Sequence, residues 1–65
     1  MMIKRMRVMS ALNILTQNRV ITPEKAGDVM KEYEKSGGEE QVILDFFEKL
    51  PQDATVSTAY RALRK

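Results

Sequence analysis

The chain has 65 residues and a formal net charge of +2, and it contains neither cysteine nor histidine. A chain of this length forms one domain, and the missing residue types exclude disulfides, thiolate-bound zinc and the usual nucleophile–base pairs of enzymes. No apolar run reaches the roughly 18 residues that a membrane helix needs. We therefore expect one cytoplasmic domain over residues 1–65, without a cofactor, a metal or a membrane contact.

The first predicted helix covers about residues 3–18. Basic residues before an apolar stretch resemble a signal peptide, but Arg7 and Asn13 interrupt the apolar part and no small-residue cleavage site follows. Between residues 8 and 15 only Ser10 and Asn13 are polar, so more than one face of this helix is apolar. We expect it to contact neighbours on two sides, either as the central helix of the monomer or with one face in a dimer interface.

The second helix is predicted to begin at Thr22-Pro23, because threonine can cap free amides and proline suits the first helical position. It extends to about Lys35, and Ser36-Gly37-Gly38 ends it, since glycine adopts the left-handed conformation of a helix C-terminus at no steric cost. Gly27 lies inside this helix and costs about 1 kcal/mol relative to alanine. A close helix crossing explains it best, and a binding notch is the alternative.

The third predicted helix covers about residues 39–50 and holds the largest apolar side chains of the chain. Glu39 and Glu40 suit its positively polarised start, and Leu50-Pro51 closes it, because proline cannot continue a helix. Its apolar residues fall on one stripe at helical spacing, which comprises Val42, Ile43, Phe46, Phe47 and Leu50. We expect this stripe to pack against the other helices.

The fourth helix is predicted to follow a turn at Gln52 and to reach the C-terminus. Asp53, Thr55 and Ser57 can each cap its start, and the apolar positions Val56, Ala59, Tyr60 and Leu63 have helical spacing. The predicted fold is thus a compact all-α domain of four helices with short connections and no strand.

Charge is segregated along the chain in a way that the small total conceals. Residues 1–20 carry +4, residues 21–53 carry −5 and residues 54–65 carry +3. One interpretation is that the terminal helices lie against the acidic middle pair and the charges neutralise each other. The other is a basic surface for phosphate groups.

The methionines near the N-terminus favour an adaptable contact surface, because methionine is flexible and polarisable. The candidate partner-binding residues are Met2, Met6, Met9 and Leu44. The partner is expected to be another protein or a second copy of this chain.

The segment from Thr55 to Lys65 resembles the recognition helix of helix-turn-helix repressors, in which a Val-Ser pair precedes small polar residues and an Arg-x-Leu ending. The resemblance implies contacts to base edges and phosphates of DNA. Five residues separate Leu50 from Val56, more than in the short turn of that motif, and DNA binding is therefore the alternative function. Its candidate residues are Lys4, Arg5, Arg7, Ser57, Thr58, Arg61, Arg64 and Lys65.

A second resemblance spans Leu12 to Leu63. The resemblance lies in the order of its parts, which are a leucine-rich helix, Ile21-Thr22-Pro23-Glu24, a helix, Ser36-Gly37-Gly38, a helix, a short turn and Arg61-Ala62-Leu63. In this order the segment is similar to the N-terminal helical module of type II secretion and type IV pilus assembly ATPases. That module docks a partner protein, and some members bind cyclic di-GMP through an Arg-Leu-Gly motif, where this chain has Glu39-Glu40-Gln41.

The same pattern, with Leu50-Pro51 before the last helix, also resembles the caspase-recruitment domains of the death fold, although the chain has no room for all six of their helices. Both resemblances imply a helical module that binds another protein. The predicted function is accordingly a small non-enzymatic protein-binding or regulatory module.

Overall fold

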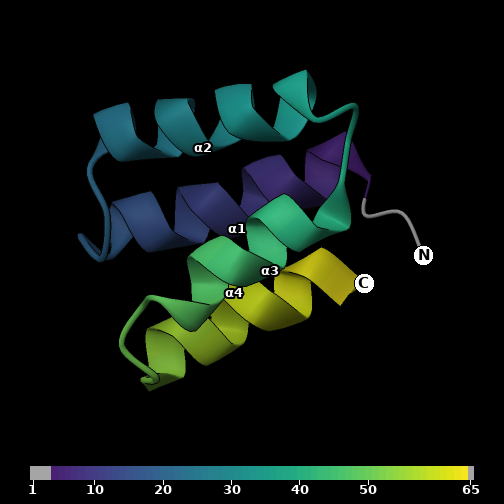
Figure 1. Ribbon diagram of the computed structural model, residues 1–65. Coiled ribbons are helices and arrows are strands. Elements are labelled where there is room, and N and C mark those ends of the chain that lie inside the picture. Colours follow the sequence, from purple (N-terminus) through teal and green to yellow (C-terminus); the bar gives the residue numbers. More distant parts are fainter. Residues whose placement is uncertain (1–3, 65) are drawn as a thin grey trace.

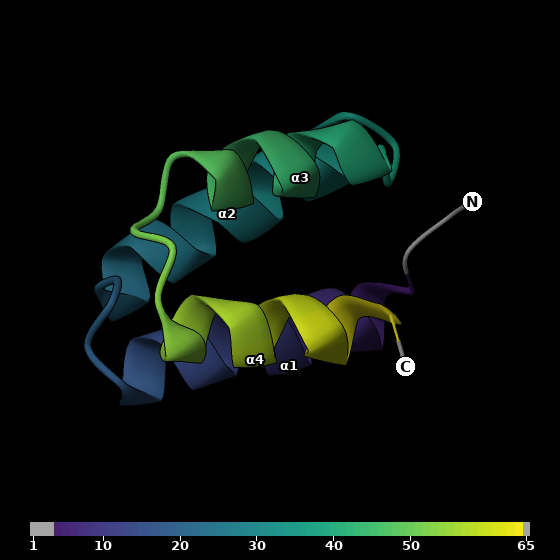
Figure 2. The same cartoon turned by 90° about the horizontal axis from the view of Figure 1, so that it is seen from below.

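Four antiparallel helices form two layers in the computed structural model, which describes residues 4–64 (Figure 1 and Figure 2). One layer consists of α1 (Arg5–Gln17) and α4 (Ala54–Arg64), and the other of α2 (Pro23–Lys35) and α3 (Glu40–Glu48). Consecutive helices run in opposite directions, so that the start of α1 and the end of α4 lie at the same end of the molecule. The described residues form no strand, and the prediction of an all-α domain of four helices is confirmed.

The hydrophobic core lies between the two layers, and α1 contributes most to it. Its buried residues are Val8, Ala11, Leu12 and Leu15, and the most extensive contact between any two helices joins α1 to α4. A smaller contact joins α1 to α2. The prediction that the first helix has neighbours on two sides is therefore confirmed.

The apolar stripe of α3 points inward, as its spacing predicts. Ile43 is fully buried and Phe47 is 2% exposed, while Phe46 is half-buried against the same core. The Phe47 ring meets both the Phe46 ring and the Tyr60 ring edge to face, with centroids 5.9 and 5.8 Å apart. Phe47 thereby connects α3 to α4 across the two layers.

The ends of α2 are formed as predicted. The backbone N–H of Lys25 donates to the Thr22 side-chain oxygen at 3.1 Å, which satisfies one free amide of the first turn. After the helix, Gly37 has φ +79° and the Gly38 amide donates to the carbonyl of Tyr33, which satisfies one of the last carbonyls.

The third helix ends earlier than predicted. Its last helical residue is Glu48, whereas the sequence predicts an end at Leu50. Proline disfavours the helical conformation in the residue before it, so Leu50 cannot complete a further turn. The Leu50 amide still donates to the carbonyl of Phe47 at 3.1 Å, and the Leu50 side chain packs against the core.

Asp53 is the residue that caps α4. The backbone N–H of Val56 donates to Asp53 Oδ1 at 2.9 Å, and that of Ser57 donates to the Asp53 carbonyl at 3.0 Å. We expect Asp53→Ala to lower the free energy of unfolding by about 0.5–2 kcal/mol, because the Val56 amide loses its acceptor. Urea denaturation followed by circular dichroism measures the change. The matched control is Ser57→Ala, and a larger loss in that variant would contradict the assignment of the cap.

Candidate functional site

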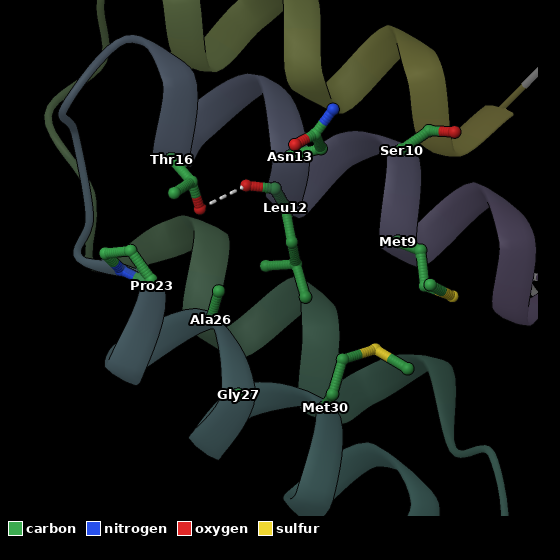
Figure 3. A pocket seen from close by; sticks show the side chains of 9 residues that line it. All are labelled: Met9, Ser10, Leu12, Asn13, Thr16, Pro23, Ala26, Gly27 and Met30. Atoms are coloured by element: carbon green, nitrogen blue, oxygen red, sulfur yellow. Dashed lines mark hydrogen bonds between the residues drawn. The ribbon is translucent and has the colours of Figure 1, made fainter.

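A groove of about 480 Å³ opens between α1 and α2 and is shown in Figure 3. We call it the α1–α2 groove. Its lining residues are Met9, Ser10, Leu12, Asn13, Thr16, Pro23, Ala26, Gly27 and Met30. None of them is charged, although 31% of the chain consists of charged residues.

The floor and sides of the α1–α2 groove are apolar. Leu12 extends from α1 toward α2, and the thioether chains of Met9 and Met30 lie on either side of the groove (Figure 3). Thr16 adds no free donor, because its hydroxyl donates to the Leu12 carbonyl at 2.8 Å. A ligand in this groove would meet mainly methyl, methylene and thioether groups.

Gly27 lines the α1–α2 groove and does not mark a close helix crossing. A Cβ atom built at Gly27 has no other heavy atom within 4 Å. The prediction of a close crossing is therefore wrong, because α1 lies too far from this position for its backbone to need a glycine. The alternative interpretation, a notch in the surface of α2, agrees with its place in the groove wall.

The candidate partner-binding residues do not form one cluster. Met6 and Met9 are the exposed large apolar side chains of the described chain, at 79% and 50% exposure. Met9 lines the α1–α2 groove and Met6 does not. Leu44 is half-buried on α3 and lines neither helical groove, and Met2 lies outside the described residues. The groove residues Leu12, Ala26 and Met30 are not singled out by the sequence pattern.

The candidate DNA-binding residues of α4 do share one face. Ser57, Thr58, Arg61 and Arg64 are all exposed and follow helical spacing. Arg64 is held against its own helix, since it donates to the Tyr60 hydroxyl at 3.0 Å and its guanidinium lies 5.0 Å from the centre of the Tyr60 ring. Lys65 lies outside the described residues.

The helix pair before this face differs from a helix-turn-helix unit. Five residues, 49–53, connect α3 to α4, and the two helices run antiparallel in different layers (Figure 2). In the DNA-binding motif a turn of three or four residues joins two helices at a steep angle. The exposed face of α4 is therefore presented differently from a recognition helix.

Basic and acidic side chains are divided between the two layers. Residues 4–20 and 54–64, which form the layer of α1 and α4 and the turn after α1, contain no acid. Their basic residues are Lys4, Arg5, Arg7, Arg19, Arg61 and Arg64. Residues 23–49 carry eight acids and four lysines. The terminal helices share the most extensive contact with each other, and their layer packs against the acidic layer across the core.

One ion pair connects the layers within the described residues. The guanidinium of Arg5, at the start of α1, lies 2.9 Å from Glu34 Oε1, at the end of α2. Both side chains are more than half exposed, so the pair contributes about 0–1 kcal/mol. Arg5 is consequently less available for phosphate than Lys4, which is exposed, while Arg7 is half-buried.

A second groove, of about 510 Å³, lies between α2 and α3, and we call it the α2–α3 groove. Its apolar lining residues are Ile21, Val29, Val42, Phe46 and Leu50, and its charged ones are Lys25, Asp28, Glu32, Asp45 and Lys49. Because α2 and α3 are antiparallel, Lys25 and Lys49 lie at one end and Glu32 lies toward the other.

Two further properties follow from the described part of the chain. Residues 4–64 contain no group of three or more acidic side chains that could hold a metal ion. None of the four described helices has the length and apolar character that crossing a membrane requires.

Comparison of the chain with protein-family models, with curated proteins and with solved structures gives no match. The resemblances noted in the sequence therefore stay predictions.

Proposed function

We propose that this domain is a non-enzymatic protein-binding module that holds an amphipathic helix of a partner protein in the α1–α2 groove. The observation that carries the proposal is the uncharged lining of this groove in a protein whose other surfaces are rich in charge. Charged residues are depleted from the centres of protein interfaces, and methionine is enriched there. An amphipathic helix in a hydrophobic groove is a common form of such recognition.

The chemistry of the partner follows from the groove. A helix with apolar residues at positions i, i+3, i+4 and i+7 and without charge on that face matches the lining, because any charge would lose its hydration without gaining an opposite charge. The notch at Gly27 leaves room for one larger side chain of that helix. Docking of a partner is also what the resemblance to the pilus assembly module implies.

The absence of an enzymatic role is part of the proposal and is supported by composition. The chain has no histidine or cysteine, and Asp45 and Glu48 are exposed on α3. Exposed carboxylates on a helix surface lack an enclosed pocket in which a substrate could be held for acid–base chemistry.

The proposal is tested with a fluorescent helical peptide of about 18 residues that carries leucines at the stated spacing. We expect binding by fluorescence anisotropy with a dissociation constant in the micromolar range. Gly27→Leu fills the notch and should weaken binding at least about tenfold, while its effect on folding is neutral or stabilising because leucine favours helices more than glycine does. If Gly27→Leu loses affinity for the peptide while it remains stably folded, the loss is caused by the filled groove and not by unfolding.

Thr58→Leu is the matched control, because it adds the same side chain to an exposed position of α4 outside the groove. It should leave the affinity unchanged. Equal binding by the wild type and Gly27→Leu would contradict the proposed site.

DNA binding is the second candidate function, and the shared exposed face of Ser57, Thr58, Arg61 and Arg64 favours it. Electrostatic binding to duplex DNA should weaken steeply between about 50 and 200 mM salt. Binding of a labelled duplex that disappears in the variant Arg61→Ala/Arg64→Ala would support this candidate. Peptide binding should be insensitive to the same salt change and to the same substitutions.

A further inference from the structure

Met6 is the most exposed large apolar side chain of the described residues and contributes nothing to the core. It lies in the first turn of α1, between Arg5, which pairs with Glu34, and Arg7, and Lys4 precedes them. An exposed methionine among cations is suited to a surface that offers an apolar cavity with acids around it.

The α2–α3 groove is such a surface. Phe46, Val42 and Leu50 give it apolar walls, and Glu32 and Asp45 are acids at its rim. The Glu32 carboxylate has no ion-pair partner among residues 4–64, and the side chain of Asp45 accepts only from Gln41, at 2.8 Å. The groove therefore offers apolar area together with three acids, Asp28, Glu32 and Asp45, against two lysines, Lys25 and Lys49.

These two surfaces are complementary in polarity and in charge, and they lie on opposite layers of the molecule (Figure 2). We propose that the domain associates head to tail with a second copy of itself, with Met6 of one copy seated in the α2–α3 groove of the next. The basic start of α1 then faces the acidic end of the groove, near Glu32, and lies away from Lys25 and Lys49. This surface is separate from the α1–α2 groove of the proposed function.

The geometry makes the association open-ended. Because Met6 and the α2–α3 groove lie on different layers, the proposed head-to-tail contact uses a different surface of each copy. A heterologous contact leaves one Met6 and one groove free at the ends, so that further copies can add until a ring closes.

Sedimentation of the full chain over a range of concentrations is the first test. At about 50 mM salt the weight-average mass should rise above the 7.5 kDa of one chain and pass twice that value without a plateau. At about 0.5 M salt the mass should fall back toward one chain, because exposed charges are then screened.

Two variants each remove one of the surfaces. Met6→Glu places an acid opposite the acidic rim, and folding should tolerate it because Met6 is exposed and an acid suits the first turn of a helix. The double variant Glu32→Lys/Asp45→Lys reverses the charge of the rim at two exposed positions. Each variant alone should stay monomeric, and an equimolar mixture should form a dimer of one copy each, because each copy supplies the surface that the other lacks.

Glu48→Lys is the matched control, because Glu48 is an exposed acid of α3 outside the groove, and this variant should associate like the wild type. A mass that stops at two copies would overturn the proposal in favour of a symmetric dimer. A monomer at every concentration, or a mixture of the two variants that stays monomeric, would overturn it as well.

Discussion

Phe47→Ala is expected to leave the domain largely unfolded at 25 °C. Truncating a buried phenylalanine costs about 3–5 kcal/mol, and a single core in a domain of this size supplies about the same amount in total. Phe47 is 2% exposed and its ring contacts both Phe46 and Tyr60, so that the truncation removes packing from α3 and α4 together. Far-UV circular dichroism measures the loss of helix directly.

Met6→Ala is the control for this truncation, since Met6 is 79% exposed. It should change the free energy of unfolding by less than about 0.5 kcal/mol. Retention of full helicity by Phe47→Ala, with a cooperative unfolding transition close to that of the wild type, would show that the two layers do not depend on this ring.

Ala59→Leu is expected to destabilise the domain by about 1–3 kcal/mol. Ala59 of α4 and Ala11 of α1 are both fully buried, and these two helices share the most extensive contact in the molecule. A larger side chain at position 59 forces α4 away from α1 or into a strained rotamer. The midpoint of urea denaturation should fall accordingly.

Ala54→Leu makes the same change at an exposed position of the same helix and should be nearly neutral. If both leucine variants are equally stable, α1 and α4 do not pack as closely as the structure indicates.

The helix boundaries follow largely from local sequence. Thr22-Pro23 and Ser36-Gly37-Gly38 predict both ends of α2, because capping chemistry depends only on neighbouring residues. The turn after α1 is less obvious, since Arg19 takes a left-handed φ of 60° where glycine is usual. The sequence does not determine which residue caps α4, because three residues could do so. In the structure the cap is Asp53.

The pairing of the helices cannot be predicted from the same signals. Amphipathic spacing indicates which residues of a helix are buried but not which helix covers them. Charge predicts that the terminal helices lie against the acidic pair, which the two layers agree with, but it does not predict that α1 and α4 share the most extensive contact. The pairing of α1 with α4 depends on apolar packing, because exposed ion pairs contribute little to stability.

The candidate groove depends on that pairing and is therefore also hidden in the sequence. Met9 and Gly27 are distinctive residues on two different helices, and only the antiparallel arrangement of α1 and α2 brings them to one groove. The one available signal is Gly27, because an exposed helical glycine costs stability without a structural reason.

The central claim is that the uncharged groove between α1 and α2 recognises a helix of another protein. The most direct test is a map of backbone amide chemical shifts by nuclear magnetic resonance. It is recorded while the helical peptide with leucines at positions i, i+3, i+4 and i+7, or a DNA duplex, is added. The account predicts that the peptide shifts the amides of Met9, Gly27 and Met30 and that the duplex leaves the spectrum unchanged. Shifts confined to Ser57, Thr58 and Arg61 on addition of the duplex, with no response to the peptide, would contradict it.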